Sequence, residues 1–329
     1  MVDFYSQSQQ HFTADMQPHY IYSPRELTRW KLALVTSLEP LEELEDLVRL
    51  YVHEGLRLFE DRLVYSHEKE WCNQKIDECA KKWFPSCNHT KALERPIYFT
   101  TYLHRTYCSV GQEELKEYIE ARLKQFYEEV LDVPLVVFDS VLDHILRIDR
   151  VLKQPLGHLL LVGASGVGKT TLTRFVSWIN DLDVFQIKAG RNYSVYDFDE
   201  DLRKVMRSAG VERKKICFIF DESNVLGPAF LERMNALLAG GEVPGLFDGE
   251  DYVKLIAACK EEARKNNRML ETDDDIYRQF TKDVQRNLHV AFTMNPANSD
   301  FSNRSASSPA LFNRCVIDWF GDWADEGLL

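Results

Sequence analysis

The sequence lacks the features of a membrane or secreted protein. No apolar run reaches the ~20 residues that a membrane-spanning helix requires. The first residues, MVDFYSQSQQHFTADMQ, contain neither a basic segment nor an apolar stretch, so we expect no secretory signal. We therefore expect a cytoplasmic protein whose cysteines stay reduced.

The cysteines are too scattered to indicate a metal site or a disulfide framework. There are seven, and none forms a C-x2-C pair. Cys72, Cys79 and Cys87 with His89 resemble a zinc set only loosely, because structural zinc sites usually contain closely spaced pairs. We favour reduced thiols without a metal.

Positive charge is scarce as well. Lys and Arg total 40 against 52 Asp and Glu, so the formal net charge is -12. Proteins that bind nucleic acid or anionic lipid through phosphates need a cationic surface. We expect neither a nucleic-acid partner nor a membrane partner.

The hydrophobic pattern changes part-way along the chain. In segments 40–65 and 112–131, apolar residues recur at three- and four-residue steps, which is typical of amphipathic helices. Segment 23–35 opens with Ser-Pro, a favourable helix start. We expect a helical domain over residues 1–130 and a second domain over residues 131–329.

The second domain has the pattern of an α/β fold. Five short apolar runs are separated by helical or loop segments, and a long insertion with its own helices lies between the third and fourth. Short, nearly continuous apolar strands that alternate with helices predict a parallel sheet covered on both faces. The runs are 158–162, 184–188, 216–220, 290–294 and 315–320.

A phosphate-binding loop follows the first run. Gly163, Gly168, Lys169 and Thr170 match G-x4-G-K-[ST], in which glycines let successive N–H groups face one anion. Lys169 would hold the β- and γ-phosphates, Thr170 would ligate Mg²⁺, and the next helix would direct its positive end at the phosphates. The residues predicted to bind ATP here are Gly163, Ala164, Ser165, Gly166, Val167, Gly168, Lys169, Thr170 and Thr171.

Two later runs end in polar residues that suit catalysis. Asp221 and Glu222 follow the third run. Asp221 would hold Mg²⁺ through water and Glu222 would polarise the attacking water as general base, although such a pair can also be a strand end or helix cap. Asn295 follows the fourth run, and we favour a role in orienting the lytic water over a simple Asn-Pro turn.

Arg314 ends the segment SPALFNR just before the last run. One role for it is an ion pair within the fold. The other is a finger that crosses a subunit boundary to a neighbouring γ-phosphate. The spacing leaves both roles open.

These motifs together form the pattern of AAA+ ATPases on a five-strand core. Longer stretches resemble the dynein heavy chains, in particular the cytoplasmic class: HYIYSPRELTRW, DESNVLGPAFLERMNALLAGGEVPGLF, RNLHVAFTMNP and SPALFNRCVIDWFGDW. The resemblance covers nearly the whole chain. It implies the helical lid of the third AAA+ module followed by the large subdomain of the fourth.

The resemblance implies roles that spacing alone does not. Arg25 would be the lid arginine that touches the third module's nucleotide, and Arg314 would be the finger facing that same nucleotide. Adenine in the fourth module's pocket would lie near Pro134, Leu135 and Val136. That pocket would receive its own lid, and a finger from the fifth module, from segments outside this sequence.

The expected function follows from the resemblance. The chain would be an ATP-binding segment of a cytoplasmic dynein ring, regulating ATP-driven, minus-end-directed movement along microtubules of the cytoskeleton. ATP or ADP and Mg²⁺ would be the cofactors, and neighbouring AAA+ modules the immediate partners. Microtubules, the coiled-coil stalk, and the intermediate and light chains would involve other parts of the heavy chain. Two alternatives stay open: a stand-alone P-loop ATPase, and a scaffold that holds nucleotide without hydrolysis. The helical domain precedes the ATPase domain, which favours the ring segment.

Overall fold

The computed structural model describes residues 1–39, 41–130, 137–187, 193–221, 228–265, 272–297 and 309–321. Its two compact units divide at residue 150. The helical unit contains residues 1–150 and the segment from Ile317 onward, and the sheet unit contains Val151–Val316. Among the described residues, no helix combines the length and apolarity needed to cross a membrane.

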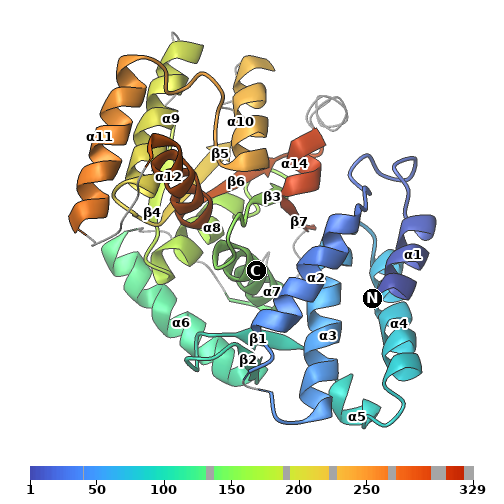
Figure 1. Cartoon of the computed structure of the whole chain (residues 1–329). Coiled ribbons are helices and arrows are strands. Elements are labelled where there is room, and N and C mark those ends of the chain that lie inside the picture. Colours follow the sequence, from blue (N-terminus) through green and yellow to red (C-terminus); the bar gives the residue numbers. More distant parts are fainter. Residues whose placement is uncertain are drawn as a thin grey trace. The chain divides into compact units, whose positions relative to one another are not determined.

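The helical unit consists of helices and one small hairpin (Figure 1). The elements are α1 (Val2–His11), α2 (Pro24–Thr36), α3 (Leu44–Phe59), α4 (Ser66–Trp83), α5 (His89–Ala92), β1 (Tyr98–Thr100), β2 (Cys108–Val110), α6 (Gln112–Glu129) and α7 (Asp139–Leu152), whose last turn passes the boundary between the units. The helices expected in segments 23–35, 40–65 and 112–131 are present as α2, α3 and α6. α3 ends earlier than expected, where the N–H of Leu63 turns back to the carbonyl of Glu60 at 2.8 Å.

The start of α2 follows from the four residues 23–26. The Ser23 side chain accepts a hydrogen bond from the backbone N–H of Arg25, and the Glu26 carboxylate accepts one from the backbone N–H of Ser23 at 2.8 Å. Pro24 occupies the first helical position, where its missing N–H costs nothing. This capping box confirms the helix start predicted from Ser-Pro. The Arg25 side chain, on the first turn, is exposed.

Aromatic residues fill the core of the helical unit around α3. Phe4, Trp30 and Phe59 come from α1, α2 and α3, and none has measurable exposure. The Phe4 ring meets Trp30 and Phe59 edge to face, with centroid distances of 5.9 Å and 5.0 Å. Contacts of this kind add ~1 kcal/mol each beyond the burial of area, so they favour one arrangement of these helices.

A buried ion pair joins α3 to α7 within the helical unit. The Arg150 guanidinium donates through Nη2, and through Nε at 2.9 Å, to Oε2 of Glu54, and the Tyr107 hydroxyl donates to Oε1 at 2.9 Å. Burial by itself would raise the pKa of the Glu54 carboxyl, but the charge and hydrogen bonds of Arg150 hold that pKa below its usual value. Glu54 is therefore an ionised carboxylate inside the unit.

The sheet unit alternates strands and helices. Its elements are β3 (Leu159–Val162), α8 (Lys169–Ile179), β4 (Asp183–Gln186), α9 (Val195–Gly210), β5 (Ile216–Asp221), α10 (Pro228–Gly240), α11 (Glu250–Lys265), α12 (Asp273–Asn287), β6 (Leu288–Met294), α14 (Pro309–Arg314) and β7 (Val316–Trp319), which begins at the boundary between the units. α10, α11 and α12 occupy the long gap predicted between the third and fourth strands.

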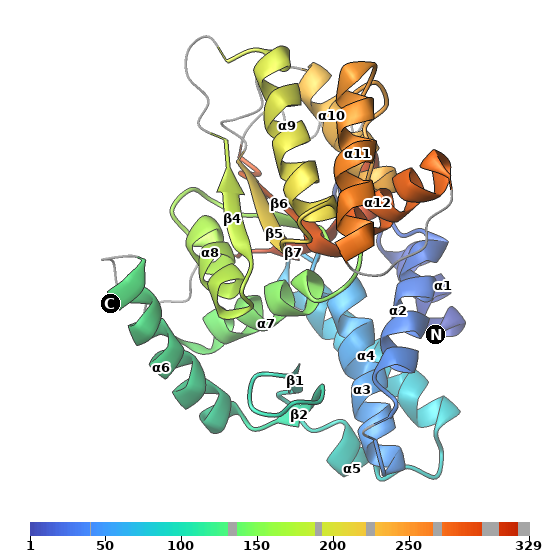
Figure 2. The same cartoon turned by 60° about the vertical axis from the view of Figure 1, so that its left-hand side comes forward.

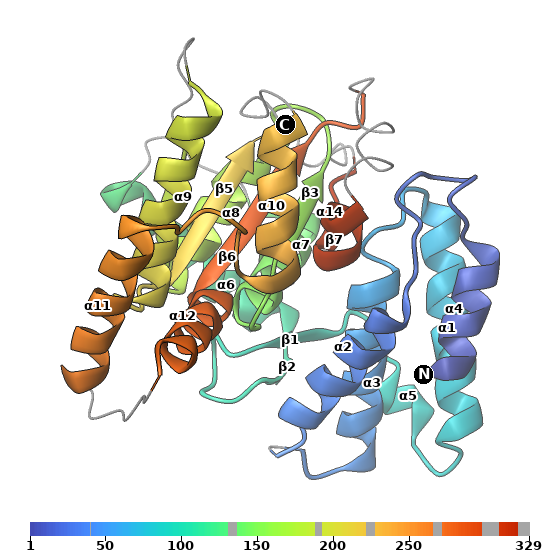
Figure 3. The same cartoon turned by 45° about the horizontal axis from the view of Figure 1, so that its top comes forward.

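The five-stranded parallel sheet predicted from the apolar runs is confirmed. The strand order is β4-β5-β6-β3-β7, and β4 with β5, β5 with β6, and β3 with β6 pair in parallel. α8 covers one face of the sheet, and α9 and α12 cover the other (Figures 2 and 3). Parallel strands end at the same edge, so the loop after β3 meets the ends of β5 and β6.

Candidate nucleotide site

An open cleft lies at the carboxyl edge of the sheet unit. Its cavity volume is about 290 Å³, close to the lower end of the ~300–1,000 Å³ typical of small-molecule sites. The loop after β3, the end of β5 and the end of β6 all contribute to it. The described residues that line it are Ser165, Gly166, Gly168, Lys169, Thr170, Thr171, Asp221, Thr293, Met294 and Asn295.

Glycine is required at two points of the loop. Gly166 has φ +88° and Gly168 has φ +78°, a left-handed backbone that strains residues with a Cβ. Gly168 is also the N-cap of α8, so the N-terminus of that helix opens at the cleft. The first N–H groups of a helix have no partner within the helix, so these groups and the helix dipole both favour an anion at such an end.

Lys169 brings a positive charge to the same loop. Its side-chain ammonium donates to the carbonyl oxygens of Gly163 at 2.8 Å and Ala164 at 2.6 Å. The residue is only 9% exposed, so the loop backbone fixes the position of the ammonium. This charge suits the phosphates of a nucleotide, because charge-assisted hydrogen bonds are the strong ones.

Two oxygen groups in the cleft suit a magnesium ion. Thr170 opens the first turn of α8 with a hydroxyl, and Asp221 ends β5 with a carboxylate. Mg²⁺ prefers oxygen ligands and is commonly bound by one or two protein groups together with substrate phosphates. The donor set therefore fits the ion predicted from the sequence.

Thr293 also belongs to the cleft, and the sequence analysis missed it. Its hydroxyl donates to Oδ2 of Asp221 at 2.8 Å. The only signal in the sequence was a hydroxyl inside the otherwise apolar run VAFTM. That signal does not say which residue the hydroxyl would meet.

Asn295 forms a local turn and lies at the cleft, and its role in orienting the lytic water stays a prediction. Its side-chain nitrogen donates to the Ser165 hydroxyl at 3.4 Å, which places the amide at the phosphate-binding loop. Its side-chain oxygen accepts from the backbone N–H of Ala297 at 3.0 Å, which forms a local turn. The turn thus holds the amide at the edge of the cleft.

Several predicted site residues are not among those that the structure places in the cleft. Glu222, Pro134, Leu135 and Val136 fall outside the described residues. Arg314 ends α14 as expected and is partly exposed, but it is not among the described residues that line the cleft. Arg25 belongs to the helical unit.

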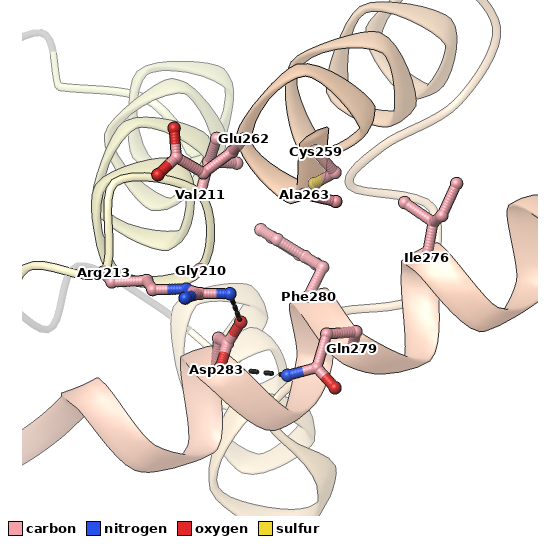
Figure 4. Close-up of a pocket in the computed structure, with 10 residues that line it drawn as sticks. All are labelled: Gly210, Val211, Arg213, Cys259, Glu262, Ala263, Ile276, Gln279, Phe280 and Asp283. Carbon is pink, nitrogen blue, oxygen red and sulfur yellow. Dashed lines mark hydrogen bonds and ion pairs between the residues drawn. The ribbon is translucent and has the colours of Figure 1, made fainter. Parts of the chain in front are cut away.

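A second hollow in the sheet unit is a seam between helices. It lies among α9, α11 and α12, and Arg213 and Gln279 both point toward Asp283 (Figure 4). Arg213 lies 3.3 Å from one oxygen of that carboxylate, and Gln279 donates to the other at 3.1 Å. Arg213 and Gln279 thus direct their polar groups at Asp283, and we assign the hollow a role in packing the three helices.

All seven cysteines lie in the described part of the chain, and none of them forms a disulfide. Burial raises the pKa of the Cys217 thiol to about 11, and it raises the pKa of the Cys259 thiol to about 11 as well. In the described part of the chain, no cluster of three His, Cys, Asp or Glu side chains is arranged for a metal ion.

A phosphate-binding loop at the carboxyl edge of this five-stranded parallel sheet defines the chain as a P-loop protein of the AAA+ class. The family model described as "P-loop containing dynein motor region D4" matches residues 133–329, and the one described as "Dynein heavy chain, ATPase lid domain" matches residues 1–69. The chain belongs to the dynein heavy chain family.

Individual relatives agree with these family models. The chain is 69% identical over 328 residues to a cytoplasmic dynein heavy chain of Paramecium tetraurelia, and 60% identical over 330 residues to that of Dictyostelium discoideum. It is 61% identical over 331 residues to dynein heavy chain-like protein 1 of Plasmodium falciparum. Each match covers 100% of this chain but only 6–7% of the relative, so the chain spans a small part of their length.

Proposed function

We propose that this chain is an ATP-binding segment of a cytoplasmic dynein ring, and that its nucleotide pocket regulates ATP-driven movement toward microtubule minus ends. The observation that carries the proposal is the cleft where Lys169, Thr170 and Asp221 meet. The proposed organisation is a lid of the preceding module in residues 1–130 and a large AAA+ subdomain in residues 131–329. The proposed location is the cytoplasm, on microtubules.

Each residue of the cleft has a proposed task. Lys169 and the N-terminal end of α8 bind the phosphates, and Thr170 and Asp221 hold Mg²⁺. Mg²⁺, when bound, neutralises charge that develops on the phosphates. Glu222 removes a proton from the attacking water, and Asn295 orients that water.

The two arginines are proposed to act on a different nucleotide. Arg25 and Arg314 would contact the nucleotide of the preceding module, whose phosphate-binding loop lies outside this sequence. The partners of this chain would then be its neighbours in the same heavy chain. Microtubules and the intermediate and light chains would associate with other parts of that chain.

Turnover by the purified chain tests the proposal. We expect the chain to bind ATP but to hydrolyse it no faster than a Glu222→Gln variant, because the pocket's lid and finger belong to other segments. ATP binding by titration and phosphate release would both be measured. Fast turnover that Glu222→Gln abolishes would instead indicate a stand-alone ATPase. Nucleotide that copurifies with the chain and never exchanges would indicate a scaffold. Absence of ATP binding would contradict all three hypotheses.

Arg314→Ala should leave ATP affinity at the cleft within about twofold, because the nucleotide that Arg314 is proposed to contact belongs to another module. The comparison is an ATP titration of the variant against the unmodified chain, with the melting temperature of each recorded. A tenfold loss of affinity in a folded variant would place Arg314 in the pocket of its own module. It would contradict the proposal that Arg314 contacts the nucleotide of the preceding module.

A further inference from the structure

The register between β5 and β6 points to one more functional residue. We propose that Thr293 is a positioning residue for Asp221, whose carboxylate it holds in the orientation that binds Mg²⁺ with the nucleotide. This inference rests on the proposed function of the cleft. It adds a residue to which the sequence motifs assign no role.

Strand pairing places the two residues side by side. Asp221 is the last residue of β5, and Thr293 is its direct partner in the parallel register. Paired strands lie about 4.8 Å apart, and partners in register project from the same face of the sheet. The 2.8 Å hydrogen bond from the Thr293 hydroxyl to Oδ2 of Asp221 follows from this placement.

The two residues differ in burial, and the difference suits the proposed roles. Every position of β6 is buried, and Thr293 is 3% exposed. Asp221 is partly exposed at the cleft. A threonine is stiff about χ1, so its hydroxyl gives a fixed donor on a rigid strand. The carboxylate is the partner whose orientation needs fixing.

An aspartate carboxylate without a hydrogen-bond donor rotates easily about its terminal torsion. The terminal torsion of Asp is broad and nearly two-fold, so the two oxygens exchange places at little cost. A donor to Oδ2 removes this freedom before the ion arrives. Ligating carboxylates are commonly held by such outer hydrogen bonds, and loss of one typically lowers metal affinity ~10–100-fold.

A purely structural role makes a different prediction. Thr293 could serve only to satisfy its own buried hydroxyl, in which case its removal would lower the stability of the chain or weaken nucleotide binding with and without Mg²⁺ alike. A positioning role affects only the part of binding that depends on Mg²⁺. The dependence on Mg²⁺ concentration therefore separates the two.

The test is an ATP titration of the 329-residue chain at a series of Mg²⁺ concentrations and in EDTA. Thr293→Val keeps the shape and removes the donor, and it should raise the Mg²⁺ concentration for half-maximal binding about tenfold. Binding in EDTA should be unchanged. Thr293→Ser restores the donor and should lie within about twofold of the unmodified chain. Thr293→Ala serves as a second hydroxyl-free variant if the valine variant does not fold.

A matched control removes a hydroxyl that is not among the described residues lining the cleft. Thr281 on α12 donates to the carbonyl of Tyr277 at 3.1 Å, so Thr281→Val should leave the Mg²⁺ dependence as it is. A folded Thr293→Val chain with normal Mg²⁺ dependence, or with equal losses in Mg²⁺ and EDTA, would overturn the inference alone. If the unmodified chain bound no Mg²⁺-nucleotide, the proposed function would fall as well.

Discussion

Lys169→Ala should lower the affinity of the chain for ATP by at least about 100-fold. The ammonium lies at the loop between the carbonyls of Gly163 and Ala164, and hydrogen bonds to charged groups contribute ~1.5–3 kcal/mol each. Two such bonds to phosphate oxygens amount to ~3 kcal/mol or more, and ~1.4 kcal/mol is a factor of ten in affinity. Titration with ATP at fixed Mg²⁺ measures the effect.

Lys260→Ala provides the control for loss of charge. Lys260 lies on α11 in the same unit, where its ammonium is 2.7 Å from Asp273 and half exposed. The control variant has the same net charge as Lys169→Ala but leaves the cleft intact, so its ATP affinity should be normal. Equal affinity of both variants and the unmodified chain would mean that the loop is not a phosphate site.

The sequence predicted the sheet well because the strands of a parallel sheet can be recognised from short stretches of sequence. Each strand of the sheet unit is a short apolar run, and the loop after β3 has a motif whose spacing is set by the phosphates it surrounds. The strand ends also placed Asp221 and Asn295 at one edge. Local patterns were sufficient for these features.

Side-chain pairs that depend on tertiary packing could not be predicted from the sequence. Asp221 and Thr293 are 72 residues apart, and their hydrogen bond exists only because β5 and β6 pair in one register. Glu54 and Arg150 are 96 residues apart. Helical periodicity showed that α3 has an apolar face, but it does not show which charged residues become buried or which partner neutralises them.

Arg150→Met should destabilise the helical unit by about 3–5 kcal/mol, because it leaves the Glu54 carboxylate buried without its counter-charge. Glu54 is 1% exposed and Arg150 is 5% exposed, so water cannot replace the lost partner. Urea unfolding of the chain, followed by far-UV circular dichroism, measures the change. The pKa of Glu54 is lowered from 4.5, so the pair's contribution is present above the ordinary glutamate pKa and is lost as the pH falls through the lower folded value.

Two variants separate the buried charge from a general loss of packing. Glu54→Gln combined with Arg150→Met removes both charges and should recover about half or more of the lost stability, since the penalty belongs to the unpaired carboxylate. Arg95→Met removes a guanidinium 2.9 Å from Asp77 on the surface of the same unit and should cost less than about 1 kcal/mol. If Arg150→Met cost no more than Arg95→Met, Glu54 would have found another partner or a proton. The ion pair would then not be what holds α7 against α3.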